Sequence, residues 1–159
     1  MKNAGSISST GLRLGGMLLC GTVLYFFANV QRVAIPGAVF NLLQEQWNVS
    51  APYITGLGSA FMYVYALNQL FIGLLVDRYG GVRVIAAGAL LFCTGSILFP
   101  LSDSLGLLYF SRALTGLGAS ALYLSLIKET MRLFERNYNI VLALIIMIGY
   151  AGGIMANAP

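Results

Sequence analysis

The residue best suited to bind a charged small molecule is an arginine inside the first long apolar segment. Arg32 follows Asn29 and Gln31 in FFANVQRVAIP, about midway along the segment if a helix there continues toward Leu43. If the segment crosses a membrane, a charge at that depth costs at least about 2.5 to 3.5 kcal/mol, so it should face a wet cavity or a partner. Arg32, with Gln31 beside it, could then bind an anionic group. Alternatively, Arg32 lies near the membrane surface and its side chain extends to water.

A second group of polar side chains lies in the next apolar segment, FMYVYALNQLF. Helical spacing would place Tyr65 on adjoining faces with Asn68 and Gln69. Amides and phenols inside a membrane are satisfied by other helices or by water. The three residues are therefore expected either to line a cavity with Arg32 or to hold two helices together.

The chain lacks the residue combinations that catalysis or metal binding requires. It has no histidine, and Cys20 and Cys93 stand alone inside apolar segments. No serine or cysteine has a base available for nucleophilic attack, and no metal site or cofactor is expected. No Asp or Glu falls deep inside an apolar segment, so no obvious carboxylate would carry protons there. The sequence thus argues against an enzyme.

Composition points to lipid as the outer solvent. Hydrophobic residues make up 58% of the chain, charged residues 9%, and the mean hydropathy is +0.83. A soluble domain carries roughly 25% charged residues, so this chain has too few polar side chains to cover a surface in water. The formal net charge of +4 comes from basic residues scattered between apolar segments. Such scatter argues against a nucleic-acid partner.

The apolar segments are long enough to cross a bilayer as helices. About 20 residues at about 1.5 Å each span a hydrocarbon core of about 30 Å. Only helices or closed barrels satisfy the backbone in lipid, and these continuous segments lack the alternation of strands. We therefore predict an all-α integral membrane protein whose residues 1–159 form one multi-span helical bundle. Its five predicted membrane helices cover approximately residues 14–39, 51–76, 82–101, 105–127 and 140–158.

The positions of the basic residues predict the orientation, because cytoplasmic loops carry the excess of Lys and Arg. One side of the predicted bundle carries Glu45 and Asp103 and no basic residue. We therefore place the N-terminus in the cytoplasm and the chain in the cell membrane. The basic residues of the opposite, cytoplasmic side are Lys2, Arg13, Arg78, Arg83, Lys128, Arg132 and Arg136.

Two links on the predicted cytoplasmic side are of interest. In GLLVDRYGGVR, Gly80 and Gly81 would allow the positive backbone angles of a tight reversal. Asp77 is unusual there, because the end of a helix already presents partial negative charge, so we expect it to have a basic partner or another helix N-terminus. In KETMRLFERNYN, we expect a short amphipathic segment with solvated charges that include Glu129. Lys128 begins this segment at the end of the fourth predicted helix.

The first of these links resembles the signature of the major facilitator superfamily between its second and third helices. That signature is Gly, three residues, an Asp followed by a basic residue, any residue, Gly, and then usually two basic residues. This chain has Gly81 and Val82 at the last two positions, with Arg83 just after. The matching residues are Gly73, Asp77, Arg78 and Gly80.

Two further stretches extend the resemblance over the whole chain. In SRALTGLGAS, residues Arg112, Gly116 and Gly118 match the fourth-helix pattern of this superfamily. IGYAGGIMANAP is similar to the glycine-rich fifth helix of several of its branches, through Gly149, Gly152, Gly153 and Pro159.

The resemblance implies most of the first six-helix half of a secondary active transporter that works by alternating access. It implies a conformational, gating role for the Asp77 loop and for the fourth-helix pattern, and in some relatives the arginine equivalent to Arg112 is linked to proton movement. A hydrogen bond from Arg112 to carbonyl groups of the first or second helix is the alternative. In branches that carry organic or inorganic anions, an arginine lies near the place of Arg32.

We expect these residues to be the front part of a longer transporter, whose C-terminal half would complete the path. The bilayer, a small-molecule substrate and a coupling proton or ion would be the other partners. A proton-coupled drug or metabolite exporter is an alternative within transport. A helical membrane scaffold that transports nothing is the alternative of another class.

Overall fold

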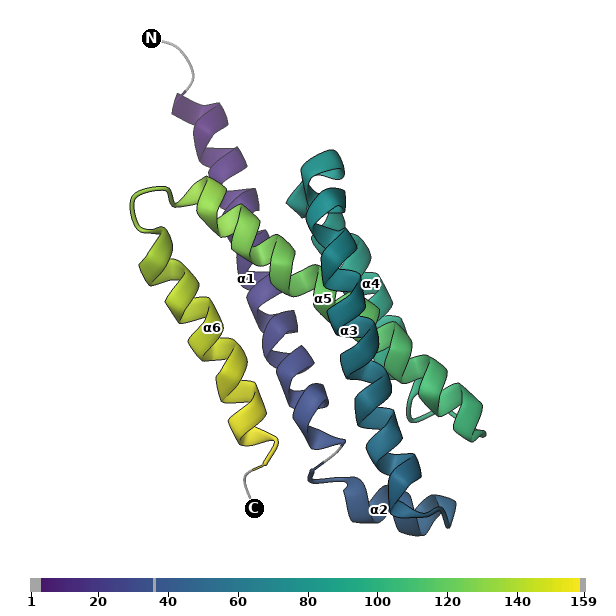
Figure 1. Ribbon diagram of the computed structural model, residues 1–159. Coiled ribbons are helices and arrows are strands. Elements are labelled where there is room, and N and C mark those ends of the chain that lie inside the picture. The colour runs from purple at the N-terminus through teal and green to yellow at the C-terminus, as the bar shows by residue number, and fades with distance from the viewer. Residues whose placement is uncertain (1–3, 36, 158–159) are drawn as a thin grey trace.

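The computed structural model describes residues 4–35 and 37–157, and within them the chain is helical, with six helices and no strand (Figure 1). Lys2 and Pro159, named above, lie outside the described residues. Five of the helices are long and apolar enough to cross a membrane, which confirms the predicted all-α membrane bundle. The helices are α1 (Ala4–Ala34), α2 (Phe40–Trp47), α3 (Ala51–Tyr79), α4 (Gly81–Leu98), α5 (Leu105–Leu133) and α6 (Tyr138–Met155).

The first helix ends earlier than predicted. α1 stops at Ala34, whereas the sequence suggested a helix to residue 39 or beyond. Pro36 in the sequence explains the difference, because a proline disfavours helical geometry in the residue before it and supplies no backbone N–H. Arg32 therefore lies in the last turn of α1 and not midway along the helix.

The fourth membrane helix, in contrast, continues past its predicted end at residue 127. α5 runs on to Leu133, so Lys128 and Glu129 are helical residues. At its other end, Ser104 is the N-cap, and its hydroxyl accepts a hydrogen bond from the N–H of Leu107 at 3.3 Å.

The reversal between α3 and α4 is made by a single residue. Gly80 has a φ of +84°, a backbone conformation that residues with a side chain rarely adopt. Gly81, expected to share this role, instead begins α4 with ordinary helical geometry. After this turn, α4 runs back beside α3, and the turn itself lies at one end of the molecule (Figure 1).

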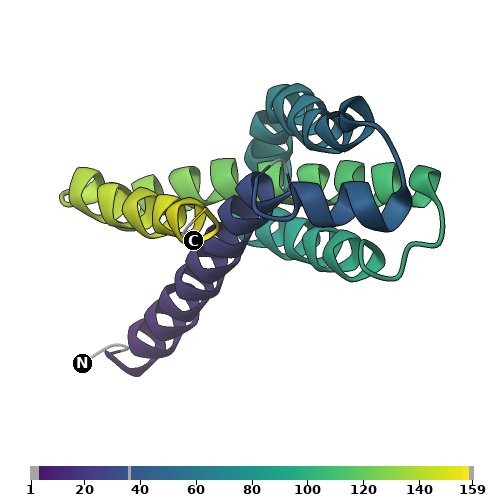
Figure 2. The same cartoon turned by 90° about the horizontal axis from the view of Figure 1, so that it is seen from below.

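α5 is the central helix of the bundle. Figure 2 shows it running across the width of the molecule, with α6 toward one end and α3 and α4 toward the other. Two of its glycines allow close contacts on different sides. A Cβ at Gly116 would lie 2.6 Å from the carbonyl oxygen of Phe61 in α3, and a Cβ at Gly118 would lie 2.6 Å from that of Gly88 in α4. Small residues at such positions let membrane helices approach closely.

α6 packs on α1 in a similar manner. Gly149 lies against the ring of Tyr25, and Gly152 lies against the backbone and ring of Phe26. A cluster of buried residues that includes Tyr25, Leu122 and Leu126 joins α1 to α5. α1 is thereby held between α6 and α5, which fixes the position of Arg32 at its end.

Candidate functional site

Arg32 belongs to a row of polar residues on one face of α1. Asn29 and Tyr25 precede Arg32 by about one and two helical turns, so the three lie on one side of the helix. Together with residues of α3 and α5 they line a pocket of about 10 Å³, about the size that holds one water molecule. The residues of this Arg32 pocket are Tyr25, Ala28, Asn29, Arg32, Phe61, Tyr65 and Ala119.

Arg32 also borders a second, wider hollow. This outer hollow has a volume of about 360 Å³ and is lined by Arg32 and residues of α3, among them Thr55, Ser59 and Tyr63. Arg32 is only partly buried, and among the described residues no carboxylate forms an ion pair with it. Its guanidinium group is therefore accessible from a space that could admit a small solute.

Gln31 does not share this surface with Arg32. Its side-chain amide donates a hydrogen bond to the hydroxyl of Ser96 in α4 at 2.7 Å. Adjacent residues of a helix point about 100° apart, so neighbouring positions in the sequence face different elements. In this structure Gln31 connects α1 to α4.

The polar residues of α3 are divided in the same way. Tyr65 lines the Arg32 pocket and stacks on Phe61, with ring centroids 6.0 Å apart. Asn68 instead donates to the hydroxyl of Ser120 at 2.7 Å and so joins α3 to α5. Gln69 is partly buried and lines none of the hollows described here. Of these three predicted residues, only Tyr65 is brought together with Arg32.

Among the seven residues of the Arg32 pocket, the sequence analysis named only Arg32 and Tyr65 as binding candidates. The polar and aromatic members that it missed are Tyr25, Asn29 and Phe61. The amide of Asn29 is buried and donates to the carbonyl oxygen of Tyr25 at 3.0 Å. The ring of Tyr25 stacks on Tyr123 of α5 at 5.3 Å. Helical spacing counted back from Arg32 would have found both residues of α1.

Arg112 is a buried arginine in the interior of the bundle, with 1% of its surface exposed. Its guanidinium lies over the ring of Phe61 at 4.7 Å, and Nη2 donates to the carbonyl oxygen of Gln31 at 3.3 Å. This contact confirms the hydrogen bond to a carbonyl of the first helix that the sequence offered as one alternative. Arg112 thus ties α5 to the last turn of α1, beside Arg32.

Asp77 has the basic partner that the sequence predicted. Its Oδ1 lies 2.6 Å from Nζ of Lys128 in α5. The same ammonium group donates to the carbonyl oxygen of Gly73 at 2.9 Å. Lys128 therefore binds the last turns of α3, where a positive charge also interacts favourably with the helix dipole.

Glu129 was predicted to be a solvated charge, and this prediction is wrong because only 4% of its surface is exposed. Its Oε1 accepts a hydrogen bond from the backbone N–H of Gly81 at 3.0 Å, at the first residue of α4. A carboxylate is favourable there, since the first N–H groups of a helix have no partner within it. A Cβ at Gly81 would lie 2.5 Å from Cγ of Glu129, so a side chain at position 81 would displace the Glu129 side chain.

The remaining residues of the signature lie outside this cluster. Arg78 and Arg83 are exposed, and neither forms an ion pair with a described carboxylate. The guanidinium of Arg78 lies over the ring of Tyr79 at 5.4 Å. Of the predicted gating residues, the structure joins Gly73 and Asp77 through Lys128, whereas Gly80 forms the turn.

Several curated proteins are similar to this chain. A probable anion transporter of rice chloroplasts (Oryza sativa subsp. japonica) is 29% identical over 150 residues, which cover 92% of this chain and 28% of that protein. A chloroplast ascorbate transporter of Arabidopsis thaliana is 31% identical over 104 residues, covering 64% of this chain and 19% of that protein. A probable sulfoacetate transporter of Cupriavidus necator is 29% identical over 112 residues, covering 70% of this chain and 25% of that protein.

The chain therefore spans less than a third of the length of these relatives. No solved structure matches it significantly. The family model described as Major Facilitator Superfamily matches residues 17–158. The match covers the five membrane-length helices, except for the first residues of α1. The match agrees with the helix pattern, the α3–α4 turn and the glycine contacts of α5, and the chain belongs to the Major Facilitator Superfamily.

Proposed function

We propose that these residues form the first part of a secondary active transporter that carries a small anion by alternating access. The chain is an integral membrane protein of a transporter superfamily and not an enzyme. Carriers built from two repeated halves hold their substrate between the halves. The names of the three relatives, which refer to anions, ascorbate and sulfoacetate, support an anionic substrate.

The proposal depends on the environment of Arg32. It is fixed at the end of α1, borders the Arg32 pocket and the outer hollow, and has no described carboxylate to neutralise it. A guanidinium group can bind a carboxylate, phosphate or sulfonate through two parallel hydrogen bonds. The phenol of Tyr63, which lines the outer hollow with Arg32, would add a further donor to an anion held there. Tyr65 lines the smaller Arg32 pocket, which has room for about one water molecule.

Transport of anions can be tested with proteoliposomes that contain the product of the complete reading frame. We expect saturable uptake of at least one small carboxylate, phosphate or sulfonate. Neutral and cationic solutes of matched size should not be carried and should not compete. Uptake of a cation, with no uptake of any anion, would contradict the proposal. Imposed proton and sodium gradients in the same vesicles would identify the coupling ion.

The proposed orientation places the N-terminus and the α3–α4 turn in the cytoplasm. Figure 1 shows the N-terminal end of α1, the α3–α4 turn and the link between α5 and α6 at the same end of the molecule. Arg78, Arg83 and Arg136 lie in or beside these links, whereas Glu45 and Asp103 belong to the links of the opposite end. This asymmetry follows the excess of basic residues in cytoplasmic loops.

Within this transporter, the Asp77–Lys128 pair would bias the conformational equilibrium. The pair is partly exposed, with 69% of the Asp77 side chain and 32% of the Lys128 side chain accessible. Pairs of this kind contribute about 0.2 to 1 kcal/mol, so Asp77→Asn and Lys128→Gln should each lower the maximal uptake rate by about 1.4- to fivefold. The KM should change little, because neither residue lies in the Arg32 pocket.

A double variant would show whether Asp77 and Lys128 act together as an ion pair or independently of each other. If the two residues act as a pair, Asp77→Asn combined with Lys128→Gln should be no slower than the slower single variant. Arg136→Gln, an exposed charge on the same side of the membrane, is the control and should transport normally. Effects that multiply in the double variant would show that the ion pair is not the functional unit.

A further inference from the structure

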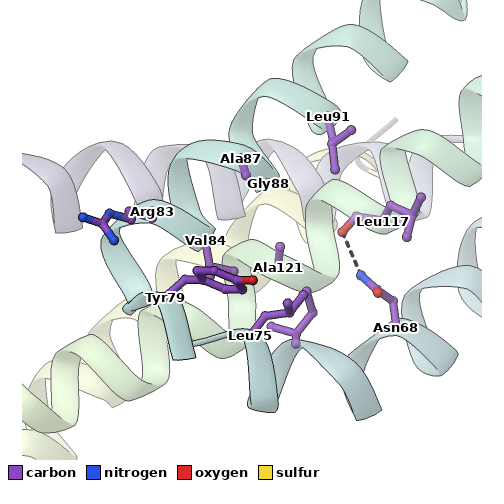
Figure 3. Close-up of a pocket in the computed structure, with 11 residues that line it drawn as sticks. Asn68, Leu75, Tyr79, Arg83, Val84, Ala87, Gly88, Leu91, Leu117 and Ala121 are labelled. Atoms are coloured by element: carbon purple, nitrogen blue, oxygen red, sulfur yellow. Dashed lines mark hydrogen bonds between the residues drawn. The ribbon is translucent and has the colours of Figure 1, made fainter. Parts of the chain in front are cut away.

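A second, apolar hollow lies between α3 and α4, with α5 as its floor (Figure 3). Its volume is about 380 Å³. Leu75 and Leu91 lie on its sides, and Leu117 and Ala121 of α5 lie beneath it. We call this hollow the α3–α4 groove. It shares no residue with the Arg32 pocket or with the outer hollow.

The groove opens on the outer face of α3 and α4. In Figure 1, α5 crosses from the side of α1 and α6 to the α3–α4 pair, and the groove is lined by α3, α4 and α5 and by no residue of α1. Leu75 and Leu91 remain 40% and 39% exposed. Between its polar ends, the apolar walls of the groove give water few partners. Within a membrane-spanning bundle, its natural occupant is a hydrocarbon chain.

The length of the groove corresponds to one leaflet of the bilayer. Tyr79 is the last residue of α3, at the membrane-surface end, and Asn68 lines the inner end of the groove. The two are 11 residues apart, or about 16 Å along the helix. The hydrocarbon core is about 30 Å thick, so the groove reaches about its middle. The amide of Asn68 is already bonded to Ser120, so it does not need a polar ligand.

The surface end of the groove carries positive charge. Arg83 lines the groove from the first turn of α4, and in Figure 3 it lies at the opposite end from Asn68. Arg78 is near, over the ring of Tyr79. No Asp or Glu lines the groove, and neither arginine has an ion pair among the described residues. Basic pockets between membrane helices favour anionic lipid headgroups.

We propose that the α3–α4 groove binds one anionic phospholipid, with an acyl chain along the groove and its phosphate on Arg83. A free anion would gain nothing from the apolar walls, and a zwitterionic lipid would place its positive group near two arginines. The proposal requires that the chain spans a bilayer and that the groove faces lipid in the complete protein. It does not depend on the substrate or on the transport mechanism.

Native mass spectrometry of the purified protein can test this site. The protein would be released from nanodiscs that contain equal amounts of phosphatidylglycerol and phosphatidylethanolamine. We expect retained phosphatidylglycerol to exceed phosphatidylethanolamine by about fivefold, the preference that one basic residue near the surface provides. Washing with inorganic phosphate should not displace the lipid. Equal retention of the two lipids would overturn the proposal.

Two substitutions test the two ends of the lipid separately. Arg83→Gln should abolish the preference for phosphatidylglycerol. Ala87→Phe, at an exposed position that lines the groove, should fill the space and abolish retention of both lipids. The matched controls are Ala86→Phe, exposed on the same helix but outside the groove, and Arg136→Gln, and both should behave as the wild type.

A wild-type preference in Arg83→Gln would exclude the proposed headgroup contact, and normal lipid retention by Ala87→Phe would exclude the acyl-chain site. If Ala87→Phe does not fold, Arg83→Gln still decides the outcome. The melting temperature of the wild type in detergent gives a second measurement, because a bound ligand stabilises the folded state. Added phosphatidylglycerol should raise it more than phosphatidylethanolamine does, and an equal effect would count against the site.

Discussion

Gly118→Ala is expected to lower the melting temperature of the protein in detergent by about 6–12 °C, as a loss of about 3 kcal/mol would do in a chain of this size. The added methyl group would meet the backbone N of Phe92 and would lie 2.6 Å from the carbonyl oxygen of Gly88. Backbone atoms cannot rotate away as a side chain can, so α4 would have to move off α5. Gly118→Leu should prevent accumulation of folded protein.

Gly106→Ala is the matched control for this effect. Gly106 is in the same helix, and a Cβ there would meet nothing within 4 Å. Its replacement should leave the melting temperature unchanged or raise it slightly, because alanine is the better helix former. Circular dichroism or a fluorescence-based thermal shift would give the comparison. Equal melting temperatures for the two alanine variants would mean that α4 and α5 are not in close contact at Gly118.

Arg32→Ala is expected to reduce anion uptake at low substrate concentration by at least about 30-fold, because removing one partner of a buried charge pair costs about 2 to 5 kcal/mol. Arg32→Lys should restore part of the activity, since lysine keeps the charge but not the two parallel hydrogen bonds of arginine. The measurement is initial uptake by vesicles with matched amounts of folded transporter.

The same experiment distinguishes the two interpretations of Arg32. If the side chain only extends to the membrane surface, Arg32→Ala will transport as the wild type does, and the proposed anion contact will be wrong. Arg136→Ala controls for the loss of one positive charge elsewhere on the protein. A larger KM with an unchanged maximal rate would assign Arg32 to binding alone, whereas a lower maximal rate would indicate a contact made during the conformational change.

Much of the fold could be predicted because lipid leaves few choices for the backbone. The membrane helices followed from continuous apolar segments, and the turn at Gly80 followed from its glycines. The unusual position of an acid at a helix end correctly predicted a partner for Asp77. The end of α1 was placed too late because the apolar segment continues past Pro36, although the proline itself indicates the break.

The site was harder to predict because sequence neighbours need not be spatial neighbours. Gln31 and Arg32 are adjacent in the chain but face different helices. Asn68 was expected to line a cavity with Arg32 or to hold two helices together, and its amide donates a hydrogen bond to Ser120 of α5. Glu129 looked like a surface charge because it lies in a charged stretch. Its burial depends on the start of α4, 48 residues earlier in the chain. No local pattern contains that contact.

The positions of Lys128 and Glu129 also constrain the rotation of α5 about its own axis. The two charges are consecutive, so they point in directions about 100° apart, one toward the carboxyl end of α3 and the other toward the amino end of α4. Turning α5 by one residue would bring an acid to the negative helix end or a base to the positive one. The order of these two neighbouring charges therefore determines how the central helix is rotated about its own axis.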